Sequence, residues 1–191
     1  LMYRAGYSSD VAAGDWFVES GAFDYVVIRE IMGNYSGTNH FGPYDTITRA
    51  QVATILWRLA GSPASSVSQP FSDADPNEYY YNALCWAKEI GVSTGYSGTD
   101  SFGPNDPVTR EQLATLFSRY ASVVDGRDTS SDCSAMDSKN GADEVSDYAR
   151  EAMGWAVDTG LITGVNGTDL EPDGTAWRAS MAEMVKRYAS F

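Results

Sequence analysis

The sequence predicts an all-α protein built from three tandem helix–loop–helix repeats, and three observations lead to this fold class. A loop motif rich in glycine and proline begins at Gly37, recurs 61 residues later at Gly98, and has a shorter third copy beginning at Gly167. An apolar stripe with helical spacing follows each loop, and a second stripe precedes it. Self-similarity at a nearly constant period indicates that one supersecondary unit is repeated along the chain.

A helix is expected before each loop, because the apolar residues there fall on one helical face. In the second copy this face extends over 80–87, and Gly91 marks the end of the helix. In the third copy the face extends over 145–156, and Gly160 follows it. The first copy has a looser apolar pattern over 22–32. Each copy is therefore expected to open with one helix.

A second helix is expected after each loop, starting at an arginine that recurs as Arg49, Arg110 and Arg178. The apolar residues behind each arginine keep the offsets i, i+1, i+3, i+4, i+7 and i+8, which line one helical face. They are Val52, Ala53, Ile55, Leu56, Leu59 and Ala60; Leu113, Ala114, Leu116, Phe117, Tyr120 and Ala121; and Met181, Ala182, Met184, Val185, Tyr188 and Ala189. Since each unit carries only a stripe of apolar surface, the three are expected to pack together.

Two of these second helices begin with a capping box, formed by Thr48 with Gln51 and by Thr109 with Gln112. In this motif the threonine hydroxyl accepts from an early backbone N–H, and the glutamine side chain reaches back to the threonine N–H. An arginine directly after the cap is electrostatically unfavourable, because a helix N-terminus already carries roughly half a positive charge. Its recurrence in all three copies suggests that the arginine serves an anionic group.

Two interpretations of the recurrent arginine remain open on the residues alone. A guanidinium beside free backbone N–H groups suits a bound carboxylate, phosphate or ketal acid. A structural ion pair with a neighbouring Asp or Glu is the equal alternative. Aromatic residues pose a similar choice, because their flat faces with polar edges suit sugar rings but also suit core packing. The aromatic residues in or next to the first helices and in the loops are Trp16, Phe17, Tyr44, Tyr79, Tyr80, Tyr81, Tyr96, Tyr148 and Trp177. Of these, Trp16, Tyr79, Tyr80 and Trp177 are the candidates for ligand contact.

The composition excludes several classes of function. The chain has 13 Lys and Arg against 26 Asp and Glu, and its formal net charge is −13. Such a surface repels nucleic acid and anionic membranes, which require a positive patch. No stretch approaches the roughly 20 consecutive apolar residues of a membrane span. Two cysteines, Cys85 and Cys133, form neither a disulfide framework nor a zinc site, although one bridge between them stays open. No metal or cofactor is predicted.

The second copy resembles an S-layer homology repeat along its whole length. The matching residues are Phe71-Ser72-Asp73, Trp86-Ala87, Gly91-Val92, Gly95, Phe102-Gly103-Pro104 and Val108-Thr109-Arg110-Glu111-Gln112-Leu113-Ala114. The first copy is similar from Gly37 through Gln51, and the third through Trp155-Ala156, 160–164, Pro172 and Arg178. The resemblance implies three repeats, at 1–62, 70–124 and, in degenerate form, 133–191.

The resemblance also implies an architecture and a function. Such triplets form an all-α body with pseudo-threefold symmetry around a central bundle that takes one helix from each repeat. Grooves between adjacent repeats bind secondary cell-wall polysaccharide through an acidic, commonly pyruvylated, sugar. By position, Arg49, Arg110 and Arg178 would meet the acidic group. The chain would then be an extracellular, monomeric module that anchors a bacterial surface protein non-covalently to the cell wall.

Three departures from the family pattern qualify this expectation. Gln51 and Gln112 replace the family glutamate, which keeps the capping box but removes a charge. The third copy has Trp177 where the capping threonine belongs and Ser180 where the glutamine belongs. Its groove is therefore expected to be weakened, altered or purely structural. The first copy lacks the opening Phe-x-Asp, unless Ser9-Asp10-Val11 replaces it.

Two rival functions are weighed against anchoring. An enzyme is not expected, because the single histidine, His40, has no repeated counterpart, and catalysis needs one asymmetric constellation. Repeated residues instead favour multivalent binding. The remaining alternative is a protein-interaction or spacer module that does not bind carbohydrate. The two cases differ at Arg49 and Arg110, which binding requires exposed in grooves and which a spacer could neutralise with carboxylates.

Overall fold

The computed structural model describes residues 7–191, and within that range the regular secondary structure is helical. Isolated β-bridges occur between loops, but no strand forms in the described residues. The all-α prediction is therefore confirmed. No helix in this part of the chain is long and apolar enough to span a bilayer. The first six residues of the predicted repeat 1–62 lie outside the described range.

The chain divides into two compact units. One combines the residues up to Ile47 with Ala176–Phe191, and the other is Thr48–Thr175. The predicted repeats do not coincide with these units, because the first unit joins the start of the chain to its last helix. The repeat boundaries and the pseudo-threefold bundle stay predictions, since the three second helices are divided between the two units.

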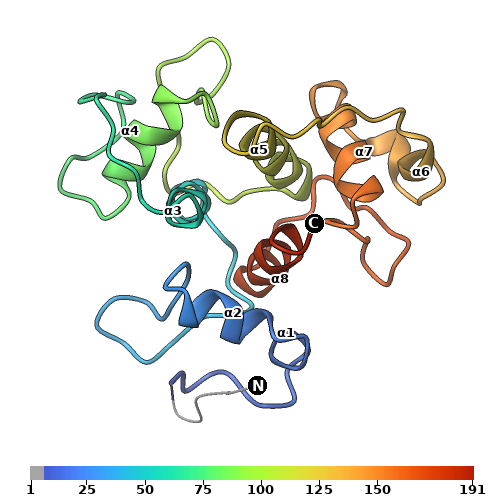
Figure 1. Ribbon diagram of the computed structural model, residues 1–191, viewed down its shortest axis with the longest axis horizontal. Coiled ribbons are helices and arrows are strands. Elements are labelled where there is room, and N and C mark those ends of the chain that lie inside the picture. Colours follow the sequence, from blue (N-terminus) through green and yellow to red (C-terminus); the bar gives the residue numbers. More distant parts are fainter. Residues whose placement is uncertain (1–6) are drawn as a thin grey trace. The chain divides into compact units, whose positions relative to one another are not determined.

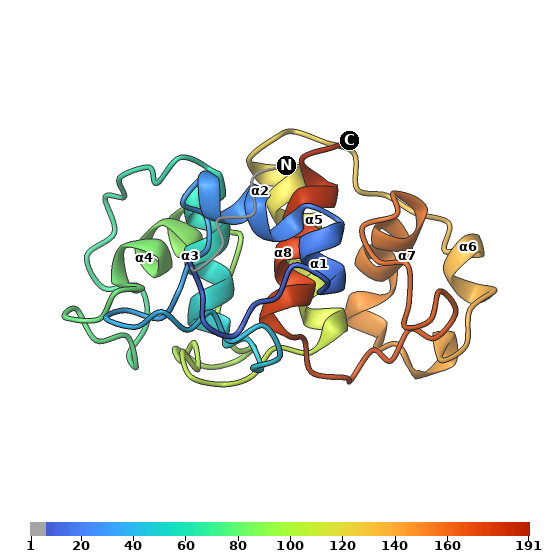
Figure 2. The ribbon, with the colours of Figure 1, turned by 90° about the horizontal axis from the view of Figure 1, so that it is seen from below.

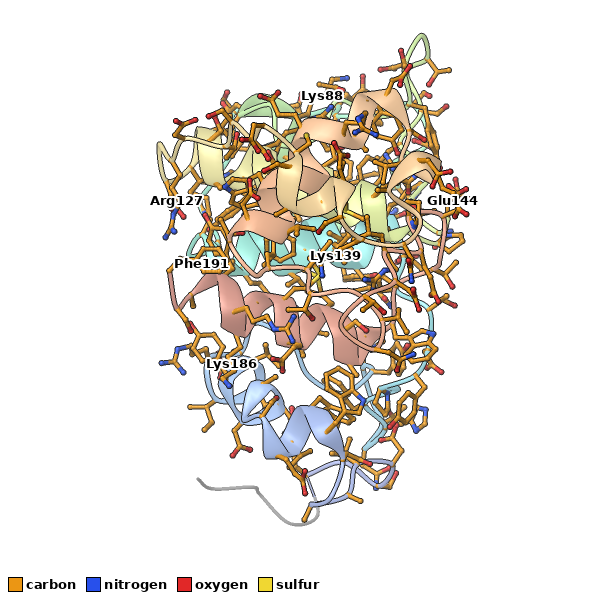
Figure 3. The ribbon with its side chains drawn as sticks, turned by 90° about the vertical axis from the view of Figure 1, so that its right-hand side faces the viewer. Lys88, Arg127, Lys139, Glu144, Lys186 and Phe191 are labelled. Carbon is orange, nitrogen blue, oxygen red and sulfur yellow. The ribbon has the colours of Figure 1, made fainter. Side chains whose placement is uncertain are left out.

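The first unit contains α1 (Trp16–Glu19), α2 (Ala22–Ile28) and α8 (Arg178–Tyr188). Helix α8 packs against α2 although the two lie at opposite ends of the sequence (Figures 1 and 2). Phe23 and Phe41 are fully buried, with ring centroids 5.0 Å apart in an edge-to-face arrangement. Lys186 of α8, labelled in Figure 3, donates to the Ser20 carbonyl between α1 and α2.

The second unit contains five α-helices. They are α3 (Arg49–Leu59), α4 (Tyr81–Glu89), α5 (Arg110–Val123), α6 (Ser134–Asp137) and α7 (Arg150–Asp158), with 3-10 turns at Ala142–Glu144 and Asp147–Ala149. Helix α3 packs on α4, while α5 and α6 both pack on α7 (Figure 1). Phe71, Leu84 and Phe102 form a buried apolar cluster with Ala50 and Ala53 of α3.

The second helix of each copy begins where the sequence predicts. Thr48 and Thr109 are the N-caps of α3 and α5, and both capping boxes are complete. Trp177 precedes α8 and makes no side-chain cap, as expected from the missing threonine. These starts are set by neighbouring residues, which explains why local sequence identifies them.

Two of the three first helices are shorter than their apolar patterns, while α4 matches the pattern over 80–87. In copy one the pattern over 22–32 gives only α2, which ends at Ile28 ahead of Glu30, a residue with φ of +57°. In copy three Val145 is extended, with φ −67° and ψ 124°, so α7 begins only at Arg150. Val145 is nevertheless buried. Apolar spacing therefore identified most of the buried residues, Val145 among them, but it overestimated the length of the helices that carry them in copies one and three.

Candidate functional site

The three recurrent arginines make the same unusual contact. Nε of each donates to a backbone carbonyl at the equivalent position of a loop in another copy: Arg49 to Phe102 at 2.6 Å, Arg110 to Leu170 at 2.7 Å, and Arg178 to Phe41 at 2.8 Å. Arg49 and Arg178 are only 7% and 6% exposed, and Arg110 is half-buried. The arginines therefore hold loop backbone in place and do not stand free on the surface.

The backbone N–H groups at these helix starts are also engaged. In α3, N–H of Arg49 donates to the Asp106 carbonyl at 2.9 Å, and N–H of Ala50 donates to the Pro104 carbonyl at 3.0 Å. The first two N–H groups of α5 and of α8 make the corresponding bonds to loop carbonyls. The expectation of free N–H groups ready for an anion is therefore wrong, because another loop of the protein already satisfies them.

The structural ion-pair alternative also fails for the described contacts of Arg49 and Arg110. Neither guanidinium has a carboxylate oxygen of residues 7–191 within ion-pair distance. Instead, the Arg49 guanidinium carbon lies 4.4 Å from the Tyr96 ring centroid and 4.8 Å from that of Phe102. Burial lowers the pKa of Arg49, against an opposing effect of Tyr96, Asp106 and Asp73. Attraction to the ring faces compensates part of this desolvation.

Aspartates shape the loops that receive Arg49 and Arg178. Asp73 accepts from the N–H groups of Phe102 and Gly103, both at 2.8 Å. Asp10 makes the same pair of bonds in the first copy, to the N–H groups of Phe41 at 2.8 Å and Gly42 at 2.7 Å. Asp10 thus replaces the aspartate of the missing Phe-x-Asp motif. The alternative left open for Ser9-Asp10-Val11 is confirmed at that residue.

A second aspartate in each of these two loops orients a tyrosine. The Tyr96 hydroxyl donates to Asp106 at 2.7 Å, and the Tyr35 hydroxyl donates to Asp45 at 3.0 Å. Tyr35 lies under Arg178 as Tyr96 lies under Arg49. The guanidinium carbon of Arg178 is 4.5 Å from the Tyr35 ring centroid. Arg110 lacks such a ring in the described chain. Two arginine sites therefore have an aromatic wall, and the one at Arg110 does not.

A groove of about 480 Å³ opens beside Arg49 within the second unit, and we call it the Arg49 groove. It is lined by Arg49 of α3, the loop 93–97, Gln112, Thr115, Leu116 and Arg119 of α5, and Tyr148. No Asp or Glu occurs among these described lining residues, although the chain has 26 acidic residues. The groove is therefore a cationic and aromatic surface on a strongly acidic protein.

Tyr148 is held at the groove by a buried glutamate. Glu111, only 3% exposed, accepts from the Tyr148 hydroxyl at 2.8 Å. The same carboxylate accepts from the Ser146 N–H at 2.9 Å and the Ser146 hydroxyl at 2.8 Å. Desolvation and the adjacent Glu111 carboxylate raise the pKa of Tyr148. Its ring, 59% exposed, is thus a neutral and oriented wall of the groove at physiological pH.

The residues predicted to contact a ligand do not all line one groove. Arg49 and Gln112 line the groove, while Thr48, Thr109 and Gln51 are used in helix capping. Trp16, Tyr79 and Trp177 are exposed and are not among the groove-lining residues, and Tyr80 is buried at 6% exposure, which fits core packing. Their role in ligand contact stays a prediction.

Among the lining residues that were not predicted as ligand contacts, those with a ring or a charge are Tyr96, Arg119 and Tyr148. For Arg119 the sequence does hold a signal. An arginine stands nine positions after each recurrent arginine, as Arg58, Arg119 and Arg187. Tyr96 and Tyr148 belong to the aromatic residues noted in the sequence, but only tertiary packing shows that these two line the groove. Within 7–191 no cluster of three or more His, Cys, Asp or Glu residues is arranged to hold a metal ion.

Comparison with known proteins identifies a family for part of the chain. Residues 70–114 match the model of the S-layer homology domain. Over 180 residues the chain is 28% identical to an endoglucanase of Bacillus sp. (strain KSM-635), covering 93% of this chain and 18% of that protein. It is 29% identical over 160 residues to the surface-layer 125 kDa protein of Lysinibacillus sphaericus, covering 82% of this chain and 13% of that protein.

A third relative is the S-layer protein EA1 of Bacillus anthracis, which is 27% identical over 185 residues, covering 92% of this chain and 19% of that protein. The chain thus spans less than a fifth of the length of each of these three relatives. The three relatives are thus two surface-layer proteins and an endoglucanase, and each match covers at least 82% of this chain.

Proposed function

Since the chain contains an S-layer homology domain at residues 70–114, we propose that it anchors a bacterial surface protein non-covalently to the cell wall. The domain and the surface-layer relatives give the chain a cell-surface or cell-wall location. The finer proposal is that the Arg49 groove binds a secondary cell-wall polysaccharide through an acidic, commonly pyruvylated, sugar.

The observation that carries this proposal is the absence of acidic residues from the described groove lining. With a net charge of −13, an acidic chain repels an anionic polymer at long range. Capture of such a polymer therefore needs a local surface of opposite sign, and the Arg49 groove supplies one. Carboxylates are the groups that a guanidinium binds with the best geometry, often through two parallel hydrogen bonds.

The Arg49 guanidinium keeps donors available for a ligand. Its single described hydrogen bond uses Nε, whereas a guanidinium has five N–H donors. No buried side-chain nitrogen or oxygen in residues 7–191 lacks a hydrogen-bond partner, so the terminal nitrogens of Arg49 reach solvent at the groove. The Nε bond and the two rings fix the orientation of these donors, which lowers the entropy cost of binding.

The aromatic residues of the groove suit a sugar. Tyr96 and Tyr148 both line it, and both hydroxyls are already bonded to carboxylates outside the lining. Their rings therefore present apolar faces of fixed orientation, on which a sugar ring can stack. We propose that the groove holds the charged sugar with Arg49 and packs it against these tyrosines.

Co-sedimentation with cell-wall sacculi from the source organism tests the proposal. Wild-type chain is expected to pellet with intact sacculi and to remain in the supernatant with sacculi stripped of secondary polymer by acid. Arg49→Gln is expected to weaken binding by about tenfold, because a charge-assisted contact is lost. Tyr148→Ala is expected to weaken it too, whereas Tyr148→Phe keeps the ring and most of the binding.

Circular dichroism and thermal unfolding of each variant separate lost binding from lost structure. If Arg49→Gln unfolds, Tyr148→Ala still tests the groove. Tyr148 is 59% exposed, so its replacement is expected to leave the fold intact. The matching variants Arg110→Gln and Arg178→Gln rank the three predicted sites. Equal pelleting of wild type with intact and stripped sacculi, or none with either, would contradict polysaccharide binding.

One observation favours the alternative of a spacer without carbohydrate binding. All three recurrent arginines bond to loop carbonyls, so each has a structural role that requires no ligand. In that case the three arginine variants would unfold at lower temperature, and none of the folded variants would differ from wild type in wall binding. Under either alternative, we propose that the chain is not catalytic, and that hydrolytic activities named for its relatives depend on other parts of those longer proteins.

A further inference from the structure

A second arginine lines the Arg49 groove, and its presence has a consequence for the ligand. We infer that the groove binds a polysaccharide segment with at least two anionic groups, one at Arg49 and one at Arg119. This inference rests on the proposed function and extends it from a single acidic sugar to a polyanionic segment. A guanidinium binds carboxylate and phosphate groups alike, so the anionic groups are carboxylates or phosphates, according to the composition of the polymer.

One face of α5 forms the floor between the two arginines. Gln112, Thr115, Leu116 and Arg119 all line the groove, with the i, i+3, i+4 and i+7 spacing of a single helical face. Arg49 lies near the N-terminal end of α5, because its N–H donates to the carbonyl of Asp106, just before that helix. From Gln112 to Arg119 the helix rises about 10 Å, at about 1.5 Å per residue.

Arg119 carries a charge that the described protein does not neutralise. Its side chain is exposed, and it has neither an ion pair nor a hydrogen bond with residues 7–191. Its counterpart in the third copy, Arg187, is paired with Glu183 four positions earlier, at 3.1 Å. The residue four positions before Arg119 is Thr115, whose hydroxyl donates to the Glu111 carbonyl at 2.9 Å.

The two ends of the groove therefore offer separate cationic positions with neutral residues between them. A single acidic sugar bound at Arg49 satisfies only one of these positions. A segment long enough to follow α5 satisfies both. Because Arg119 is exposed, its attraction for the second anionic group of the segment is sensitive to salt. Arg119 is thus a residue that selects for ligand length and charge.

Isothermal titration with fragments of the wall polysaccharide tests the inference. Acid-released polymer is fractionated into fragments with one acidic group and fragments with several. The proteins compared are wild type, Arg119→Gln, Arg119→Lys and Arg127→Gln. Arg127 is an arginine of the same unit that pairs with Asp125 outside the groove lining, so its variant controls for the change in net charge.

Arg119→Gln is expected to weaken binding of the longer fragments by about three- to tenfold and to leave binding of the single-charge fragment unchanged. Its affinity for long fragments should also fall less than that of wild type between about 0.05 M and about 0.5 M NaCl. Arg119→Lys retains a cation and most of the affinity, and Arg127→Gln behaves as wild type.

The outcomes separate this inference from the proposed function. If wild type binds the fragments and Arg119→Gln has the same affinity for both lengths at both salt concentrations, the inference of a second anionic contact is wrong. The proposed anchoring function then stands. If Arg119→Gln weakens both lengths equally, Arg119 does not select for length and the inference is likewise overturned. If wild type binds neither fragment, the proposed function itself fails.

Discussion

Gly103 and Gly126 share a left-handed backbone conformation but have different surroundings, with φ of +69° and +64°. A Cβ atom at Gly126 would meet no heavy atom within 4 Å. At Gly103 it would lie 2.2 Å from Oδ2 of Asp106 and 2.7 Å from the Tyr96 ring. Gly103 is therefore required both by its conformation and by the aspartate–tyrosine pair that forms part of the arginine site.

Replacing each glycine by alanine separates these two requirements. Gly126→Ala is expected to lower the free energy of unfolding by about 1 kcal/mol, the cost of an alanine in the left-handed region. Gly103→Ala is expected to cost a further 1–3 kcal/mol or so, because the new methyl group displaces Asp106 and Tyr96. Urea unfolding followed by circular dichroism measures both values. If both variants lower the free energy of unfolding equally, Tyr96 and Asp106 move aside for the methyl group without loss of stability.

The arginine at the start of α3 illustrates how far residue chemistry alone can lead. The recurrent position of Arg49 indicated a special role, and the structure confirms that the side chain is used in an unusual way. The partner could not be inferred, because Phe102 lies 53 positions away along the chain. An anion and an ion pair were the two options considered, whereas the observed partner is a backbone carbonyl.

At the level of elements, α5 depends on the cap that Thr109 provides. Its hydroxyl accepts from the N–H of Gln112 at 3.3 Å, and the Gln112 side chain accepts from the N–H of Thr109 at 3.3 Å. Thr109→Ala is expected to lower the free energy of unfolding by about 1 kcal/mol, since a half-buried helix start loses an acceptor. Thr109→Ser keeps the oxygen and should remain within a few tenths of wild type.

The same urea titration measures this pair, and Trp177→Ala provides a comparison at a helix start without a side-chain cap. If Thr109→Ser and Thr109→Ala destabilise equally, the threonine methyl group matters and not its capping oxygen. This result would leave the sequence motif intact but change its physical explanation.

Elements also show where apolar spacing fails. The second helices were located correctly because the recurrent arginine and a continuous apolar stripe mark the start and the buried face, with a capping box as a further mark at α3 and α5. The first helix of the third copy was overestimated, since Val145 contributes to the core from an extended segment before α7. Burial and helix formation are separate properties, and a stripe of apolar residues reports the first more directly than the second.

At the level of the whole molecule, the last helix completes the first unit. Helices α1 and α2 have only four and seven residues, too short to be stable alone, and they pack on α8. Arg178 of α8 also donates to the carbonyls of Phe41 and Gly33, both at 2.8 Å. The start of the chain is therefore expected to depend on residues near its end.

Removal of residues 178–191 tests this dependence by hydrogen exchange and mass spectrometry. Amide protection of residues 7–47 is expected to be lost, because the buried faces of Phe23 and Phe41 lose the helix packed against them. Residues 48–175 form a compact unit of their own and should retain most of their protection. Retained protection in 7–47 after the truncation would contradict this role of α8.

The sequence by itself determined the class of fold, the three loop motifs, the two capped helix starts and the family resemblance. These features depend on residues a few positions apart, whose geometry is fixed by helix and turn chemistry. Only the tertiary structure decided what the arginines contact, and only it brought Arg119 and Tyr148 to the same groove as Arg49. Arg178 and Phe41 are 137 positions apart, and such pairings depend on how the helices pack, which local sequence spacing does not encode.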